Sequence, residues 1–239
     1  MKNKLRDKLL EDYTVHYKRV NKSVSQITQK SRDSFVAMYG RYLTILPQNS
    51  LVLDAGCGTG LLLQHLSVFN NLKLVGVDIS QGQINIARAS LLNAELICAD
   101  ALDYLQAHKK KFSAIFCMDV IEHLPNDDDC LDLAEALYGA LVPRGFCIIR
   151  SPNAANMTAS YSRYMDMTHK RSFTRTSLLQ LMDVAGFQNC GVIPVASPHF
   201  TGKVRLGIEH AIHRALFLIC GSGLEYIFTS NIICIGYAP

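Results

Sequence analysis

The sequence lacks the features that would place it in a membrane, outside the cell or on nucleic acid. Its longest apolar stretches fall far short of the roughly twenty residues that cross a bilayer. Its first residues, Met1 to Asp7, lack the apolar core of a signal peptide. The 24 Lys and Arg against 20 acids give a formal net charge of +4, scattered along 239 residues, so no nucleic-acid partner is expected. These absences predict a cytoplasmic protein.

The sequence also lacks cysteine pairs with the close spacing of a zinc site. Most of its eight cysteines, including Cys98, Cys117, Cys147 and Cys234, lie inside apolar, strand-like runs. Buried free thiols explain that placement better than a disulfide framework does. We therefore expect reduced cysteines and a reducing compartment.

Short apolar runs alternate with helical patterns between Leu51 and Pro152. This alternation predicts a parallel, doubly wound α/β sheet with helices on both faces. A chain of this length suits one domain. The expected strands are 51–53, 72–77, 94–98, 112–117, 146–149, 188–195 and 231–237, and the expected helices include a polar N-terminal segment up to about residue 30, 34–46 and 176–185.

A glycine-rich turn, Asp54-Ala55-Gly56-Cys57-Gly58-Thr59-Gly60, joins the first strand to a helix. Glycines let a ligand approach the backbone closely, and the free N–H groups of the following helix face that ligand. A dinucleotide-binding turn would have a small residue at Leu61, and Asp54 would lie near the phosphates of a dinucleotide. The turn therefore predicts a nucleoside site that suits positive charge.

Three further acids follow later strands: Asp78, Asp100 and Asp119. Asp78 comes one βα unit after the glycine turn, where a carboxylate can accept hydrogen bonds from both hydroxyls of a ribose. Ligands of open α/β sheets bind at the carboxyl ends of the strands, so we expect these acids to share one site.

These motifs, in this order and with Pro143-Arg144-Gly145 before the fifth strand, resemble the class I S-adenosylmethionine-dependent methyltransferases. The resemblance implies a Rossmann-like, three-layer αβα fold with a seven-stranded, mostly parallel sheet and an antiparallel last strand. It implies S-adenosylmethionine as cofactor and S-adenosylhomocysteine as product. It suggests that Asp100 meets the adenine amino group while Ile79 and Ala101 border the base. The implied cofactor residues are Asp54, Gly56, Cys57, Gly58, Gly60, Asp78, Ile79, Asp100, Ala101 and Met118.

On this resemblance the chain is expected to form one methyltransferase domain, residues 1–239, with three parts. Residues 1–47 would form an N-terminal helical lid, residues 48–152 a cofactor-binding core, and residues 153–239 an acceptor-side segment with an insertion at 196–229.

The loop after the fourth strand, Asp119-Val120-Ile121-Glu122-His123-Leu124-Pro125, resembles a signature of small-molecule methyltransferases, including the ubiquinone-biosynthesis O-methyltransferases. In some of those, the acids and the histidine are associated with a divalent metal, and Mg²⁺ is the candidate here. The pattern has Asp119 where the resemblance calls for glutamate. The shorter side chain leads us to expect no metal.

A later segment, from Asp166 through His169 to Gly186 and Phe187, resembles bacterial methyltransferases of surface-glycan and lipid-linked saccharide synthesis. The resemblance implies O-methylation of a saccharide hydroxyl. His169 is the preferred base because imidazole serves that role near neutral pH. Asp166 is expected to orient it, and Arg163 or Arg171 to pair with an acidic acceptor.

Three alternatives stay open from the sequence. The first is an O-methyltransferase for a quinone precursor or other small molecule, with His123 as the base. A non-catalytic adenosyl-binding module would keep the cofactor motifs without needing an acceptor histidine. A nicotinamide-dependent oxidoreductase would require Asp54 and Leu61 to be tolerated in its phosphate turn.

The insertion contains a helical pattern at 203–220 whose apolar residues share one face. His210, His213 and Arg214 lie on or near the other side. Such a helix either rests on a membrane surface, where a lipid-linked acceptor would be found, or packs on its own domain. The apolar positions are Val204, Ile208, Ala211, Ile212, Ala215, Leu216 and Ile219.

Overall fold

The computed structural model describes residues 8–9, 27–91, 93–197, 199–221 and 225–239. The expected polar N-terminal helix lies largely outside the described residues, as does more than half of the expected lid. The second expected helix, 34–46, is present as α3 (Gln29–Leu43). It begins earlier because the Thr28 side chain caps it by accepting from the Ser31 N–H.

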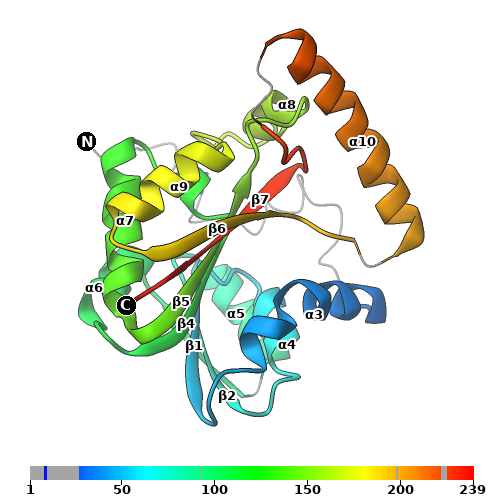
Figure 1. Cartoon of the computed structure of the whole chain (residues 1–239). Coiled ribbons are helices and arrows are strands. Elements are labelled where there is room, and N and C mark those ends of the chain that lie inside the picture. The colour runs from blue at the N-terminus through cyan, green and yellow to red at the C-terminus, as the bar shows by residue number, and fades with distance from the viewer. Residues whose placement is uncertain (1–7, 10–26, 92, 198, 222–224) are drawn as a thin grey trace.

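A seven-stranded sheet in the order β3-β2-β1-β4-β5-β7-β6 forms the centre of the structure (Figure 1). The pairs among β1 to β5 are parallel, whereas β7 runs antiparallel to both β5 and β6. The Rossmann-like sheet with an antiparallel last strand is confirmed. The strands are β1 (Ser50–Ala55), β2 (Leu72–Asp78), β3 (Ala94–Cys98), β4 (Phe112–Met118), β5 (Leu141–Pro152), β6 (Gln188–Pro194) and β7 (Asn231–Tyr237).

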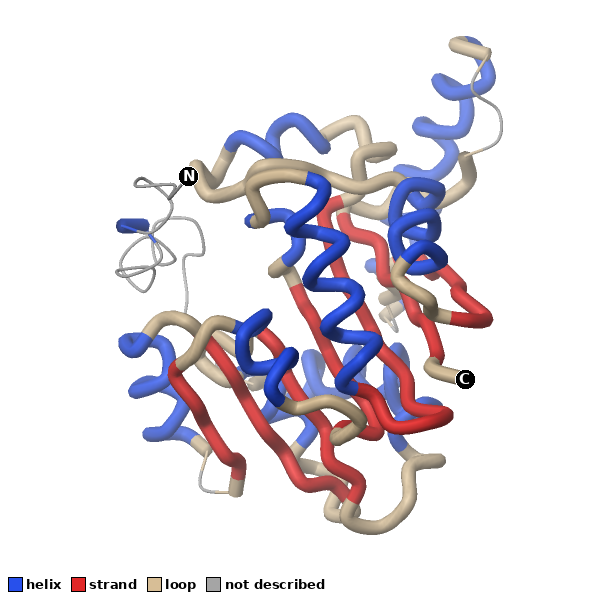
Figure 2. The backbone as a smooth tube through the Cα atoms, turned by 90° about the vertical axis from the view of Figure 1, so that its left-hand side faces the viewer, coloured by secondary structure: helices blue, strands red, loops and turns tan. Residues whose placement is uncertain are grey.

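Helices cover both faces of the sheet (Figure 2). Side chains of a strand alternate between the two faces, so Val52 packs in one half of the core and Leu53 in the other. The half with Val52 is closed by α3, α4 (Leu61–Leu66) and α5 (Gln81–Ser90). The half with Leu53 is closed by α6 (Ala101–Ala107), α7 (Asp127–Ala140) and α9 (Arg175–Val184).

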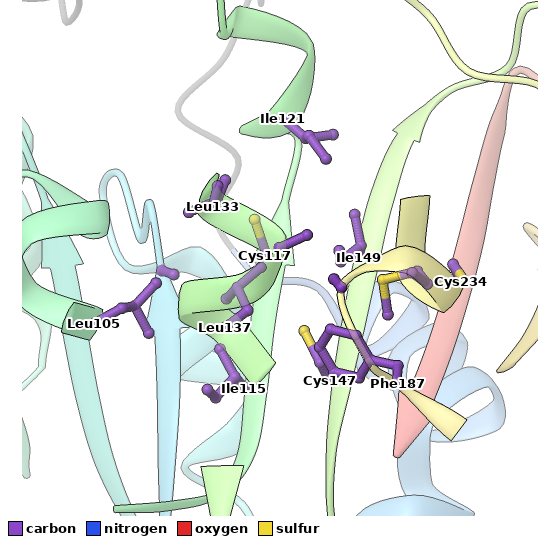
Figure 3. Packing of buried hydrophobic residues seen from close by; sticks show 14 of the residues in the cluster. Leu105, Ile115, Cys117, Ile121, Leu133, Leu137, Cys147, Ile149, Phe187 and Cys234 are labelled. Atoms are coloured by element: carbon purple, nitrogen blue, oxygen red, sulfur yellow. The ribbon is translucent and has the colours of Figure 1, made fainter. Parts of the chain in front are cut away.

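Three of the four cysteines that were expected to be buried are buried in the structure. Cys117, Cys147 and Cys234 lie in the core beside α7 and α9, as expected (Figure 3). Cys98 is exposed instead, because β3 is an edge strand and one side of it meets solvent. All eight cysteines are free thiols.

Two helices, α8 (Ala159–Tyr164) and α10 (Phe200–Ile219), follow the fifth and sixth strands and lie beyond the sheet (Figure 1). The helix α10 packs on the domain through its partly polar face. The buried His213 accepts a hydrogen bond from the Met157 N–H at 2.7 Å, and the ring of Phe217 lies 4.9 Å from that of Phe228.

The apolar face of α10 is largely exposed, and Val204, Ile208 and Ile212 line an open cavity together with Met157 and Thr158. Ile208 is 59% exposed, Ile212 51% and Ile219 81%. The expected alternative in which this helix packs on its own domain thus agrees with the contacts that His213 and Phe217 make.

Candidate active site

A cavity of about 910 Å³ lies where the carboxyl ends of β1 to β4 meet. Its wall combines α3, the turn after β1, the ends of β2 and β3, the loop after β4 and side chains from the segment 162–169. Among the residues expected to hold the cofactor, Gly60 does not line it. Those that do are Asp54, Gly56, Cys57, Gly58, Asp78, Ile79, Asp100, Ala101 and Met118.

The glycine turn is tied to β2 by its backbone. The N–H groups of Gly56 and Cys57 donate to the carbonyl of Val77 at 2.8 and 2.9 Å. Gly56 has a φ of +82°, and an added Cβ would lie 2.3 Å from a side-chain carbon of the loop after β4. Gly60, with a φ of +78°, begins α4, and its Cβ would lie 2.5 Å from Leu91. Close packing beneath the turn therefore accounts for the glycine at position 60.

Two carboxyl groups, Asp54 and Asp78, line one end of the cavity. Asp78 accepts hydrogen bonds from the N–H groups of Gly58 and Ser80, both at 2.8 Å. Burial raises the pKa of Asp78, and these two donors counteract part of that rise. Burial, followed by the nearby charge of Asp78, raises the pKa of Asp54 to about 8. Because uncompensated negative charge is costly here, the site favours a positively charged ligand.

The end of β3 presents an acid beside apolar side chains. Asp100 caps α6 by accepting from the N–H of Leu102 at 2.8 Å, and its side chain also borders the cavity. Ile79, Ala101 and Met118 line the same cavity. An apolar wall with a carboxylate at its edge matches a planar base that carries an amino group.

The acid after β4 is paired with a cation that the sequence reasoning missed. Arg150, near the end of β5, donates to Asp119 through Nε at 2.8 Å and through Nη2. Asp119 adopts a φ of +57°, a conformation that asparagine and aspartate tolerate better than most residues. The sequence could have indicated the role of Arg150, because a charged residue stands directly after the apolar run Ile148-Ile149.

Glu122 lines the same cavity and is 1% exposed. Within the described part of the chain, its Oε2 has no hydrogen-bond partner. Burial raises the pKa of Glu122 well above its usual range, and the charge of Asp119 adds to the rise. Ionisation of this side chain is therefore disfavoured.

Two histidines meet at the cavity wall. The rings of His123 and His169 are edge to face, with centroids 4.8 Å apart. Nδ1 of His123 lies 2.8 Å from Oγ1 of Thr168, and Nδ1 of His169 lies 2.8 Å from the carbonyl of Ser162. Burial, with a contribution from His169, lowers the pKa of His123 to about 4. His123 is therefore neutral near pH 7 and able to accept a proton.

Asp166, the third expected catalytic residue, also lines the cavity. Its Oδ1 accepts from the Thr168 N–H at 2.8 Å and from the Thr168 hydroxyl at 2.6 Å. Burial opposes ionisation of Asp166, but these hydrogen bonds and the nearby histidines outweigh it and lower the pKa. The structure thus connects Asp166 to His123 through Thr168, a link that the sequence did not suggest.

The donor set for a metal differs from the expected one. Among the described residues, Glu122, His123 and His169 could hold an ion, because one ligand atom of each lies within 4.8 Å of the others. Asp119 is paired with Arg150 instead. Mg²⁺ prefers a shell of oxygen ligands, so a site with two imidazoles fits it poorly and suits Zn²⁺ or iron better.

The two arginines expected to meet an acidic acceptor are engaged elsewhere. Arg163 donates to the carbonyl of His169, and Arg171 forms an ion pair with Asp127. Neither lines the cavity.

The helix α3, which lies within the segment expected to form a lid, contributes a wall of the cavity. Phe35, Met38 and Tyr39 line the cavity. Burial raises the pKa of Tyr39 to about 12. The hydrophobic period predicts the helix, whereas its position over the glycine turn depends on contacts with distant residues such as Phe116, whose ring lies 5.7 Å from that of Tyr39.

The sheet order, the glycine turn and the acids around this cavity define a class I S-adenosylmethionine-dependent methyltransferase. Residues 31–191 match a family model described as a methyltransferase domain, and the chain belongs to that family. The cofactor is S-adenosylmethionine.

Two curated relatives share the name ubiquinone biosynthesis O-methyltransferase. The chain is 30% identical over 112 residues to the ubiquinone biosynthesis O-methyltransferase of Hydrogenovibrio crunogenus, covering 44% of each chain. It is 24% identical over 155 residues to the enzyme of that name from an Azoarcus species, covering 56% of this chain and 66% of the relative. The chain thus spans about half to two thirds of the length of these relatives.

Solved structures share the fold over most of the chain. A methyltransferase from Archaeoglobus fulgidus superposes with a TM-score of 0.66 at 19% identity, over 95% of this chain and 99% of that one. A phosphoethanolamine N-methyltransferase from Haemonchus contortus, in complex with S-adenosylmethionine, superposes with a TM-score of 0.65 at 19% identity, over 98% of this chain and 60% of that one.

Asp78→Ala should weaken binding of S-adenosylhomocysteine by about 1.5–3 kcal/mol, the scale of a hydrogen bond to a charged group. Isothermal titration calorimetry measures the loss. Asp103→Ala is the matched control, because this exposed acid of α6 lies outside the cavity lining. An unchanged dissociation constant in a folded Asp78→Ala protein would remove Asp78 from the cofactor site.

Proposed function

We propose that the protein methylates an oxygen of a small aromatic acceptor of the catechol or quinone-precursor type. The observation that carries this proposal is the pair of imidazoles, His123 and His169, at the wall of the same cavity as the glycine turn. The names of the curated relatives support the acceptor class. A saccharide hydroxyl, favoured by the sequence pattern around His169, is the second candidate and has no support from those relatives.

S-adenosylmethionine supplies an electrophilic methyl group on a positively charged sulfur when it is bound. The glycine turn and Asp78 would hold it at one end of the cavity, with Asp100, Ile79 and Ala101 around the adenine. Methyl transfer depends mainly on alignment of the two reactants. A phenol loses its proton far more readily than an alcohol does, so a neutral histidine is a sufficient base.

We propose that the reaction requires no metal ion. Arg150 neutralises Asp119 through two donors, and burial disfavours ionisation of Glu122. The acids of the loop after β4 are thus accommodated without a divalent cation.

The exposed face of α10 supports a further proposal, a peripheral contact with an anionic membrane surface. Ile208, Ile212 and Leu216 follow one another at intervals of four residues on this face. The exposed cations Lys203 and Arg205 lie at the start of the helix, where they suit anionic lipid headgroups. In the described part of the chain, no helix has the length and apolarity needed to cross a bilayer. A lipophilic acceptor would be met at such a surface.

His123→Ala should slow methyl transfer to a catechol-type acceptor by roughly a hundredfold, the usual contribution of a general base. Binding of S-adenosylhomocysteine should stay within about twofold, because His123 lies on the acceptor side. Transfer is followed by the mass shift of the product, with quinone precursors, nucleotide sugars and lipid-linked saccharides assayed in parallel. If His169→Ala loses activity on a saccharide while His123→Ala keeps it, the acceptor is a saccharide and His169 is the base.

Exhaustive treatment with EDTA should leave the rate of methyl transfer unchanged. The expected reason is the Arg150 and Asp119 pair, which replaces the charge that a cation would supply. If chelation abolishes turnover and added Zn²⁺ or Mn²⁺ restores it, Glu122, His123 and His169 are metal ligands and the proposal of a metal-free reaction fails.

The double variant Ile208→Glu/Ile212→Glu should bind vesicles of phosphatidylcholine with phosphatidylglycerol at least tenfold more weakly than the parent, measured by co-sedimentation. Burying one such side chain contributes roughly 1.5–3 kcal/mol, which the glutamates would remove. Val184→Glu is the control, because Val184 is 69% exposed at the end of α9, away from this face. Equal binding by parent and double variant, or no binding by the parent, would refute the contact.

A further inference from the structure

Thr168 lies between the carboxylate and the imidazole of the candidate active site. Its side chain is buried, at 1% exposure. The hydroxyl Oγ1 is 2.6 Å from Oδ1 of Asp166 and 2.8 Å from Nδ1 of His123. Thr168 does not line the cavity itself, so its effect on a bound acceptor passes through its neighbours in the lining, His123 and Asp166.

The protons in this chain of contacts can be assigned. A hydroxyl has one proton to donate, whereas an ionised carboxylate only accepts. The Thr168 hydroxyl donates to Asp166, so its oxygen can only accept from His123. Nδ1 of His123 must then carry the proton, and Nε2 keeps its lone pair.

We propose that Thr168, held by Asp166, is a positioning residue that fixes His123 in the Nδ1–H tautomer so that Nε2 receives the acceptor's proton. This inference rests on the proposed function and deepens it, because it selects His123 rather than His169 as the base. The carboxylate of Asp166 reaches the imidazole through the hydroxyl and stabilises the positive charge that forms on it, as the aspartate of a hydrolase triad does directly.

The step balances in atoms and charge. The acceptor oxygen forms a bond to the methyl carbon as the carbon–sulfur bond breaks, and that bond's electron pair stays on sulfur. The oxygen's proton moves to Nε2 of His123. One positive charge therefore passes from the sulfonium to the imidazolium, which returns its proton to solvent after the product leaves.

The geometry around Thr168 makes the assignment rigid. Its backbone N–H also donates to Oδ1 of Asp166, at 2.8 Å, so the backbone and the hydroxyl hold the same carboxylate oxygen. The threonine side chain is stiff at χ1 because it is branched at Cβ. His123 itself stands on the 3-10 turn η1 (Ile121–His123), whose Ile121 is fully buried.

The first test reads the tautomer in the wild-type protein and uses one variant only to assign the signal. Nitrogen-15 NMR of histidine-labelled wild-type protein, with S-adenosylhomocysteine bound, reports which ring nitrogen of each histidine is protonated, and His123→Gln assigns the signal. We expect Nδ1–H at His123. Protonation of His123 at Nε2 alone overturns the proposal, whether or not any acceptor has been found. Failure of the proposed function would appear separately, as no methyl transfer from a protein with the expected tautomer.

The second test compares Thr168→Val with Thr168→Ser. Valine keeps the shape and removes the hydroxyl, whereas serine keeps it. Thr168→Val should shift His123 away from the pure Nδ1–H tautomer and lower kcat by at least tenfold, while KM and the affinity for S-adenosylhomocysteine change by less than about twofold. Thr168→Ser should restore both the tautomer and most of kcat.

Equal kcat and tautomer in the valine and wild-type proteins would overturn the proposal, and thermal unfolding checks that both variants fold. If the valine protein does not fold, the wild-type spectrum and the serine variant decide the matter.

Discussion

Parallel pairing of β1 with β2 and β4 is the constraint on which the site depends. Asp54 pairs in register with Gly76 of β2 and with Phe116 of β4. The three strands therefore end at one edge of the sheet, and Asp54, Asp78 and Asp119 reach a single cavity from it. The hydrogen bonds from Gly56 and Cys57 to the Val77 carbonyl continue the pairing beyond β1 and set the turn in place. A shift in this register would move the carboxylates apart, and the cavity would no longer form.

The charges at this edge divide the cavity into two chemically different ends. At the glycine turn, burial and the charge of Asp78 raise the cost of ionising Asp54, and a positively charged cofactor relieves that cost. At the loop after β4, Arg150 already neutralises Asp119, and burial disfavours ionisation of Glu122. At the histidines, burial lowers the pKa of His123 and keeps its imidazole unprotonated near pH 7.

The sequence predicted what local patterns determine. The strand at 231–237 has the predicted bounds as β7, and Gly56, Cys57 and Gly58 of the predicted glycine turn line the cavity. It did not predict contacts between distant segments: Arg150 meets Asp119 across 31 positions and Thr168 meets His123 across 45. Cys98 was expected to be buried because its run is apolar, but that pattern does not reveal which strand lies at the edge of the sheet. The roles of the individual site residues stay predictions.

The orientation of α10 shows how specific contacts can outweigh hydrophobic burial. The helix buries His213, which both accepts from the Met157 N–H and lies 2.7 Å from the Glu209 carbonyl through Nδ1. Asn156 holds the Glu209 carboxylate at 2.8 Å. Rotating the helix to bury Ile208 and its neighbours would break these hydrogen bonds. Each buried polar group left without a partner would cost about 1–3 kcal/mol. The polar contacts therefore keep the apolar residues of α10 exposed. The segment that joins β6 to α10 begins at Val195, which lines the cavity.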